Sequence, residues 1–155
     1  MLQNEPIARA EMLIRKPVSE VFEAFVNPEI TGKFWFTRGD QRLEEGKTVT
    51  WYWDMYGVSA EVEVKAIEQN KRILIEWPRP VEWQFTPKGD DATFVSVTES
   101  GFEGTDDEKV AQAIDSMGGF TLTLAGCKAY LEHGIELNLV ADHSPDHLVE
   151  GWSNR

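Results

Sequence analysis

One acidic residue interrupts a run of alternating apolar positions, and it is the residue best placed to do chemistry. Val95, Val97 and Glu99 occupy every second position of a strand-like segment, so the carboxylate lies on the same side of the strand as the two valines. A carboxyl group in a dry cavity could donate or accept a proton. The alternative, which we favour, places Glu99 at a rim, solvated or paired with Arg79 or Lys33.

Aromatic residues form the second group with a chemical use. The sequence has six tryptophans, and period-two spacing places several large rings on the inward side of successive strands: Trp51, Trp53, Trp77, Trp83 and Phe85. Such rings line ligand slots, but they also fill the core of a curved sheet. We predict that at least two of these tryptophans line a cavity. Trp35, on a short helical segment, is expected at the open end.

The histidines argue against a catalytic triad and against a metal site. All three, His133, His143 and His147, lie at or beyond the end of the last long helical pattern, away from the inward strand positions. His143 and His147 have the four-residue spacing of a helical zinc pair. Pro145 favours a first helical position, which would leave His143 outside the helix. We therefore predict no metal and, without a glycine-rich phosphate loop, no cofactor.

Charge and composition exclude further classes. The chain has 15 basic and 27 acidic residues, a net charge of -12, which repels nucleic acid and anionic lipid surfaces. Without a long apolar stretch or a signal peptide pattern, we expect a soluble cytoplasmic protein with no membrane insertion. The single cysteine, Cys127, falls on an apolar helical stripe, where burial would make it inert.

The order of elements predicts an α+β fold. A strand at 7–14 precedes two short helices, and six strands separated by turn signals fill 39–102. A long helix follows at 106–133, capped by acidic residues at its start and by Gly134 at its end. Its expected buried stripe has apolar residues at spacings of three and four: Val110, Ala113, Ile114, Met117, Phe120, Leu124, Cys127 and Leu131. The second short helix is expected at 29–36. The inward strand positions are expected to carry aliphatic residues as well: Val49, Val58, Ala60, Val62, Val64, Ile73, Ile75, Val81, Val95 and Val97. We expect one domain over 1–135 and a tail over 136–155, with one helical turn at 144–151.

Two adjacent glycines, Gly118 and Gly119, interrupt the long helix. Each costs about 1 kcal/mol relative to alanine inside a helix, so a compensating role is expected. One explanation is close packing against the sheet or a kink, which we favour. The other is that the missing side chains leave room for a ligand.

Several phrases of the sequence resemble one superfamily in order and spacing. They are KPVSEVFEAFVNPE, EEGKTVTWYW, VKAIEQNKRILIEW, TFVSVTESGF and GGFTLTLAGCKAYLEHG, which together extend over residues 7–134. The pattern resembles the START-like or SRPBCC superfamily, in the branch named for the activator of the heat-shock chaperone ATPase. The chain departs from that branch at Phe120, where tryptophan is frequent, and at Glu45, where a second glycine is common. The resemblance implies a helix-grip fold, in which a curved antiparallel sheet of about seven strands wraps around the long C-terminal helix and encloses an apolar cavity.

Because this fold serves many activities, three functional hypotheses follow. The leading one is a protein that binds a hydrophobic small molecule, aromatic or lipid-like. The second is a cyclase or hydrolase with Glu99 as acid or base and with Tyr56 or Arg79 stabilising charge. The third, implied by the resemblance, is a chaperone-associated interaction module, and a homodimer through an edge strand or the tail stays open. The candidate ligand-binding residues are Trp35, Trp51, Trp53, Tyr56, Trp77, Trp83, Phe85, Glu99, Met117, Gly119, Phe120 and Leu124.

Overall fold

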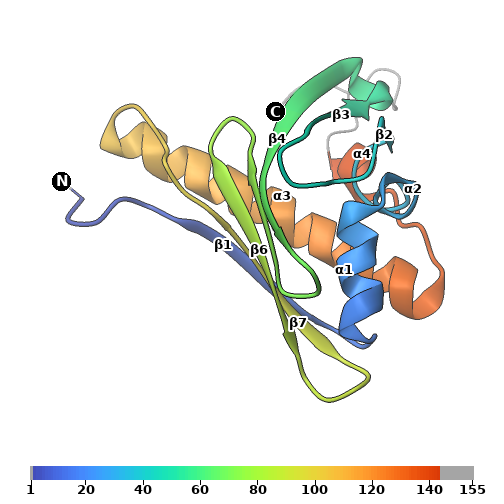
Figure 1. The fold of residues 1–155 in the computed structure, drawn as a ribbon. Helices are drawn as coiled ribbons and strands as arrows, with labels where there is room; N and C mark the ends of the chain where they lie inside the picture. The colour runs from blue at the N-terminus through green and yellow to red at the C-terminus, as the bar shows by residue number, and fades with distance from the viewer. Residues whose placement is uncertain (1, 144–155) are drawn as a thin grey trace.

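The computed structural model of the protein describes residues 2–143 of the chain. Seven strands, four α-helices and one short 3-10 helix make up this part (Figure 1). In chain order they are β1 (Ala8–Ile14), α1 (Val18–Val26), α2 (Pro28–Thr31), β2 (Arg38–Gly39), β3 (Thr48–Trp53), η1 (Asp54–Tyr56), β4 (Val58–Glu68), β5 (Arg72–Glu76), β6 (Pro80–Pro87), β7 (Thr93–Glu99), α3 (Asp106–His133) and α4 (Leu139–His143). None of these helices is both long and apolar enough to cross a membrane.

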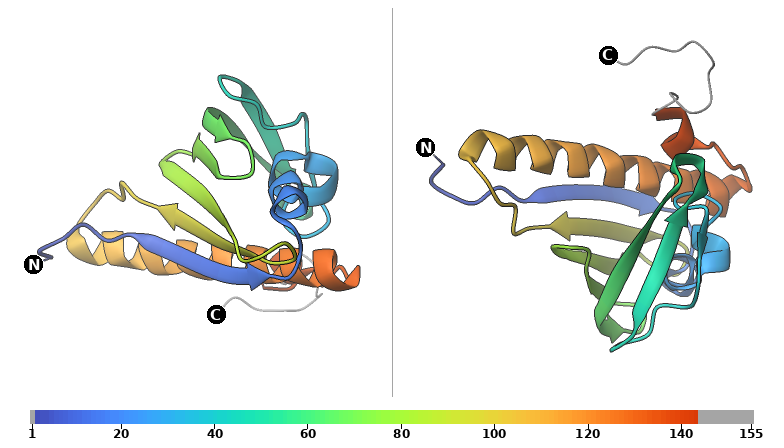
Figure 2. Two further views of the ribbon diagram at one scale, coloured as in Figure 1. Left: turned by 60° about the horizontal axis from the view of Figure 1, so that its bottom comes forward. Right: turned by 90° about the horizontal axis from the view of Figure 1, so that it is seen from above.

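All seven strands belong to one antiparallel sheet in the order β1-β7-β6-β5-β4-β3-β2. Consecutive strands pair as a meander from β2 to β7, and β1 completes the sheet by pairing with β7, Ala8 opposite Glu99 and Ile14 opposite Thr93. A register shift between Val64 and Ala66 bends β4 against β5. Figure 2 shows the result: α3 lies along β1, and the curved sheet turns away from the helix towards β3. The predicted α+β helix-grip fold is confirmed.

Both ends of α3 fall where the sequence predicts them. At the start, Thr105 caps the helix by accepting a hydrogen bond from the Glu108 N–H, and three acidic residues occupy the first turn. At the end, Gly134 adopts a left-handed backbone with φ 67° and donates its N–H to the carbonyls of Ala129 and Tyr130. These caps bound a helix of 28 residues.

The buried face of α3 differs from the predicted stripe. Ala113, Phe120, Leu124 and Cys127 are buried as expected, but Val110, Ile114 and Met117 are among the exposed large apolar residues of the described chain. Thr123 and Gly126 are buried in their place. The reason is that the first turns of α3 lie beside β1 and not across the sheet (Figure 2), so the predicted stripe has no partner there.

The inward positions of the strands are otherwise confirmed. Trp51, Trp53, Trp83 and Phe85 are buried, and so are the aliphatic residues predicted to lie beside them, which include Val49, Val62, Val64, Ile73, Ile75, Val81, Val95 and Val97. There are three exceptions. Val58 is exposed and Ala60 is half-buried, because burial along β4 begins only at Val62. Trp77, just beyond β5, is also half-buried.

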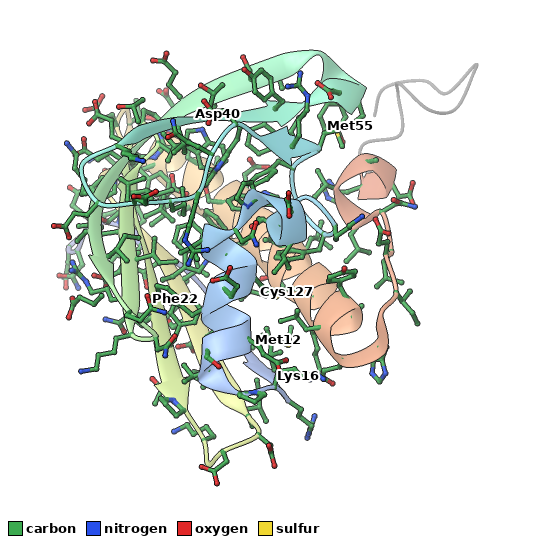
Figure 3. All side chains as sticks on the ribbon, turned by 45° about the vertical axis from the view of Figure 1, so that its right-hand side comes forward. Met12, Lys16, Phe22, Asp40, Met55 and Cys127 are labelled. Atoms are coloured by element: carbon green, nitrogen blue, oxygen red, sulfur yellow. The ribbon has the colours of Figure 1, made fainter. Side chains whose placement is uncertain are left out.

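The second short helix is shorter than the sequence suggests. The stretch 29–36 is predicted to be helical, but α2 ends at Thr31. Asn27 caps it by accepting from the Glu29 N–H at 3.1 Å. The following segment turns inward and buries Phe34, Trp35 and Phe36 in the main core. Cys127, labelled in Figure 3, lies in the same core, and burial raises the pKa of its thiol, as expected for an inert cysteine.

Residues 136–143 belong to the predicted tail, yet part of it packs on the body of the fold. Val140 of α4 contacts the main core, and its carbonyl accepts a hydrogen bond of 2.6 Å from the Tyr56 hydroxyl. Figure 2 shows α4 beside the turn between β3 and β4. The helical turn predicted at 144–151 lies outside the described residues.

The glycine that packs closely in α3 is Gly126. A Cβ at this position would lie 3.0 Å from the Phe34 carbonyl oxygen and 3.2 Å from the Phe34 Cβ. A Cβ at Gly118 or Gly119 would meet no atom within 4 Å. Close packing against the sheet is therefore wrong as an explanation for the glycine pair, the kink stays a prediction, and the close approach lies two turns further along the helix.

Alanine substitutions at Gly126 and Gly118 should change the stability of the protein in opposite directions. We expect Gly126→Ala to lower the free energy of unfolding by about 1–2 kcal/mol through overpacking against Phe34. The control, Gly118→Ala, should raise it by about 1 kcal/mol, because alanine is the better helix former and space is available. Urea denaturation measures both values. Equal stability of the two variants would mean that the Phe34 segment yields to the added methyl group.

A second contact joins the end of α3 to the end of β1. The Lys128 ammonium donates to the Leu13 carbonyl at 2.8 Å and to the Glu132 carboxylate at 2.7 Å, and the Arg15 N–H donates to the same carboxylate at 2.7 Å. Burial acts to raise the pKa of Glu132, but the Arg15 N–H and the Lys128 ammonium outweigh it and leave the pKa below its usual value.

This contact should make stability depend on pH. Because folding lowers the pKa of Glu132, its contribution is present above the unfolded value of about 4.3 and is lost as the pH falls through the folded value. We expect Glu132→Gln to lower the free energy of unfolding at pH 7 by about 1–2 kcal/mol. The difference should shrink towards pH 3 in urea titrations. Exposed Glu61→Gln removes the same charge and should show neither effect.

Candidate functional site

A pocket of about 430 Å³ opens between the middle of α3, α4, the η1 turn and the connection from β5 to β6. Its volume falls within the rough range of 300–1,000 Å³ that is common for small-molecule sites. More of its lining is apolar than polar. The lining residues are Trp35, Tyr56, Trp77, Pro78, Arg79, Glu99, Asp115, Ser116, Gly119, Phe120, Leu122, Thr123, Val140 and His143.

Aromatic rings in mutual contact form one wall. Trp35 is at the centre: its ring centroid lies 5.7 Å from that of Trp77 and 6.0 Å from that of Phe120, both in edge-to-face geometry. The rings behind support this wall, since Trp53 stacks on Trp77 at 5.4 Å and Trp51 lies 4.9 Å from Trp35. The wall is therefore an outer layer of the core, held in place by further indoles.

An ion pair forms the polar end of the pocket. Arg79 lies in the connection between β5 and β6, and its Nε donates to Glu99 Oε2 at 2.7 Å. The Glu99 side chain, at the end of β7, is only 5% exposed, and that of Arg79 is 28% exposed. The guanidinium also lies 4.8 Å above the Phe102 ring. Glu99 thus faces inward, as the alternation predicts, and has the cationic partner that we favoured for it.

The mouth of the pocket is formed by α3 and α4. Asp115 and Ser116 precede Gly119 by about one helical turn, and His143 stands at the end of α4. The hydrogen bond from Tyr56 to Val140 joins the η1 turn to α4 across this opening. The η1 turn and the five-residue α4 give one side of this opening less regular structure than α3 gives the other.

Half of the predicted ligand-binding residues meet in this pocket. They are Trp35, Tyr56, Trp77, Glu99, Gly119 and Phe120. Five others lie outside its lining and are buried in the core: Trp51, Trp53, Trp83, Phe85 and Leu124. Met117 is 44% exposed and is not among the lining residues. Within the described chain, the Trp83 indole N–H is a buried donor without a hydrogen-bond partner.

Sequence reasoning found Gly119 and Phe120 of α3 but missed the other residues that α3 and α4 contribute to the pocket. Asp115, Ser116, Leu122 and Thr123 are four and three residues on either side of Gly119. Residues at these spacings surround one spot on a helix, so the glycine itself was a signal for them. No such signal points to Val140 and His143, because the sequence after Gly134 predicts only a tail.

Within residues 2–143, no group of three or more histidine, cysteine, aspartate or glutamate side chains is arranged to hold a metal ion. A zinc site built on His143 and His147 would need both side chains, and His147 lies outside the described residues.

Solved structures with a similar fold come from several bacteria. The protein SSP2350 from Staphylococcus saprophyticus is 32% identical, with a TM-score of 0.77 over 85% of this chain and 96% of that one. DynU16, from the dynemicin biosynthetic locus, is 21% identical, with a TM-score of 0.74 over 86% of this chain and 49% of that one. The Aha1 dimer from Colwellia psychrerythraea is 17% identical, with a TM-score of 0.71 over 83% of this chain and 98% of that one.

Among curated proteins none matches the chain. A family model does, over residues 15–132, which extend from the end of β1 to the last turn of α3 and include most of the pocket lining. That model describes the activator of Hsp90 ATPase homolog 1-like proteins. Together with the relative at 32% identity, it shows that this chain belongs to the family of activator of Hsp90 ATPase homolog 1-like proteins.

Proposed function

We propose that this protein binds a hydrophobic small molecule in the pocket between α3, α4 and the β5–β6 connection. The observation that carries the proposal is the joint presence of an apolar aromatic wall and one buried ion pair. Trp35, Trp77 and Phe120 supply ring surface, while Arg79 and Glu99 supply the few polar atoms that orient a ligand in such sites. The cytoplasmic location expected from the sequence stays a prediction.

A relative gives independent support. DynU16 is a protein of the dynemicin biosynthetic locus, and therefore of a locus concerned with a small molecule. At 21% identity its role does not transfer to this chain, but its fold is the same. Small-molecule binding by this chain is thus compatible with the biosynthetic locus in which one protein of the same fold is found.

An enzymatic role for Glu99 has less support. Its carboxylate is held by the Arg79 guanidinium at 2.7 Å, so it is one half of an ion pair and not an isolated acid facing a dry cavity. Tyr56, the second residue of that hypothesis, uses its hydroxyl to bind the Val140 carbonyl. Both side chains line the pocket, where the contacts favour holding a ligand over transferring a proton.

The binding proposal is tested by filling the pocket from α3. Gly119→Leu places a branched side chain at the mouth without an initial clash, and we expect it to weaken binding of the neutral dye Nile red at least tenfold. The control is Gly118→Leu, whose position has equal space but lies outside the lining. Dye fluorescence gives the affinity, and circular dichroism melting checks the fold.

Wild-type protein that binds neither Nile red nor any molecule retained in native mass spectrometry from expressing cells would contradict the proposal. Equal loss of binding in both leucine variants would place the dye elsewhere on the protein.

Self-association is a second candidate, favoured by one surface. Val110, Ile114 and Met117 follow each other at spacings of four and three on α3, and all are exposed. A relative, the Aha1 of Colwellia psychrerythraea, is a dimer in solution. We propose that this apolar face of α3 meets a second copy of the chain. Two copies with a net charge of -12 each repel one another, so salt should favour the contact.

Sedimentation velocity measures this association directly. We expect a dimer whose fraction rises with protein and salt concentration, and we expect Ile114→Lys to shift it to monomer. Val58→Lys changes an equally exposed apolar residue on β4 and should leave the dimer intact. A wild-type protein that stays monomeric at high salt would exclude this use of the face.

A further inference from the structure

We infer that the ligand is a neutral, planar aromatic molecule with one polar group that both donates and accepts a hydrogen bond, such as a phenol. This inference rests on the proposed function, because it names the chemical class that the same pocket would take. Three properties of the lining carry it: the sign of its charges, the pairing of buried Glu99 with partly buried Arg79, and the shape of its apolar wall.

The charges of the lining disfavour an anionic ligand. Arg79 is the only arginine or lysine in the described lining, and its charge is already matched by Glu99. Asp115 adds a further negative charge at the mouth. The chain as a whole carries a net charge of -12. A carboxylate entering this pocket would therefore meet a repulsive field and no arginine or lysine that lacks an acidic partner.

A cationic ligand is disfavoured for the complementary reason. To pair with Glu99 it would have to approach within a few ångströms of the Arg79 guanidinium, which is held at 2.7 Å from the same carboxylate. A buried charge without its own partner is costly. The ion pair is thus already complete, and a neutral ligand leaves it undisturbed.

The same ion pair can recognise a neutral polar group from both sides. A guanidinium has five N–H donors and the contact with Glu99 uses Nε, while the carboxylate offers a second oxygen as acceptor. A hydroxyl placed beside the pair can accept from arginine and donate to glutamate. The Phe102 ring, 4.8 Å from the guanidinium, and the position of Glu99 at the end of β7 hold both groups in place. Such a fixed pair can select a hydroxyl over an ether or a bare ring.

The apolar wall favours a flat ring over a flexible chain. Trp35 meets Trp77 and Phe120 in edge-to-face geometry, at 5.7 and 6.0 Å between ring centroids. An aromatic ligand can extend this arrangement in offset or edge-to-face contacts, which stabilise beyond the area that they bury. An acyl chain would gain only the burial of area and would lose rotational freedom on binding.

A matched panel of small probes tests the inference. The panel is 2-naphthol, 2-methoxynaphthalene, 2-naphthoate, 2-naphthylmethylammonium and 1-dodecanol, each titrated at pH 7 against the full chain by tryptophan fluorescence and calorimetry. We expect 2-naphthol to bind at least tenfold more tightly than every other member. Weak binding of 2-methoxynaphthalene would show that the hydrogen bond donated by the ligand contributes to affinity. Weak binding of 1-dodecanol would show that the aromatic ring does.

Substitutions in the ion pair should change which probe binds most tightly. Loss of the fold would weaken the binding of every probe and would not favour a different one. Glu99→Gln leaves Arg79 unmatched, so 2-naphthoate should become the preferred probe. Arg79→Met leaves Glu99 unmatched, so 2-naphthylmethylammonium should be preferred. The double variant Arg79→Gln/Glu99→Gln keeps donors and acceptors without charge, and it should again prefer 2-naphthol. It also serves as the test if a single variant fails to fold.

The outcomes separate this inference from the proposed function. If naphthoate or dodecanol binds the wild type as well as 2-naphthol does, the ligand class is wrong while small-molecule binding stands. If all three variants keep the wild-type preference for 2-naphthol, the inference is also overturned, because the ion pair would then have no part in recognising the ligand. If no member of the panel and no Nile red binds, the proposed function fails, and this inference fails with it.

Discussion

The fold depends on covering one apolar face of a strongly curved sheet. The inward positions of β3, β5, β6 and β7 carry large rings and branched aliphatic side chains, and nearly all of them are buried. A sheet with one apolar face needs an apolar element against it, and the segment of α3 from Phe120 to Cys127, together with α1, supplies it. The rest of α3 is held by contacts at the edge of the sheet, such as those of Lys128 and Glu132 with the end of β1.

The pocket is a consequence of this incomplete cover. Phe120 is the first large side chain of α3 to enter the main core, and the helix before it faces the connection from β5 to β6 across open space. Gly118 and Gly119 stand at this transition and fill none of that space. The cost of two glycines inside a helix, about 1 kcal/mol each, is thus not offset by packing. A kink in the helix and room for a ligand at the pocket are the two explanations that remain for the pair, and the position of Gly119 in the pocket lining favours the second.

Local patterns were enough to predict the strands, the helix ends and the inward residues, because each depends on neighbours in the sequence. Alternation placed Trp51, Trp83 and Glu99 correctly, and the caps Thr105 and Gly134 bounded α3. The stripe of α3 failed at Ile114 and Met117, because helical periodicity cannot tell where along its length a helix leaves the sheet. The same limit applies to Trp51, Trp53 and Trp83: alternation shows that they point inward, but only the packing shows that other rings separate them from the pocket.

The contribution of α4 shows a different limit. Nothing in the sequence after Gly134 indicates that Val140 packs on the core, since the three apolar residues of α4 are consecutive and a helix of five residues is too short to show a periodicity. Its position depends on the Tyr56 hydroxyl, 84 residues earlier in the chain. That hydrogen bond, with the packing of Val140 on the core, closes the pocket wall with a helix of only five residues, and short peripheral elements of this kind open at low free-energy cost. A pocket with a rigid aromatic wall and a buried ion pair on one side, and such a helix on the other, can admit a ligand without disturbing the residues that select it.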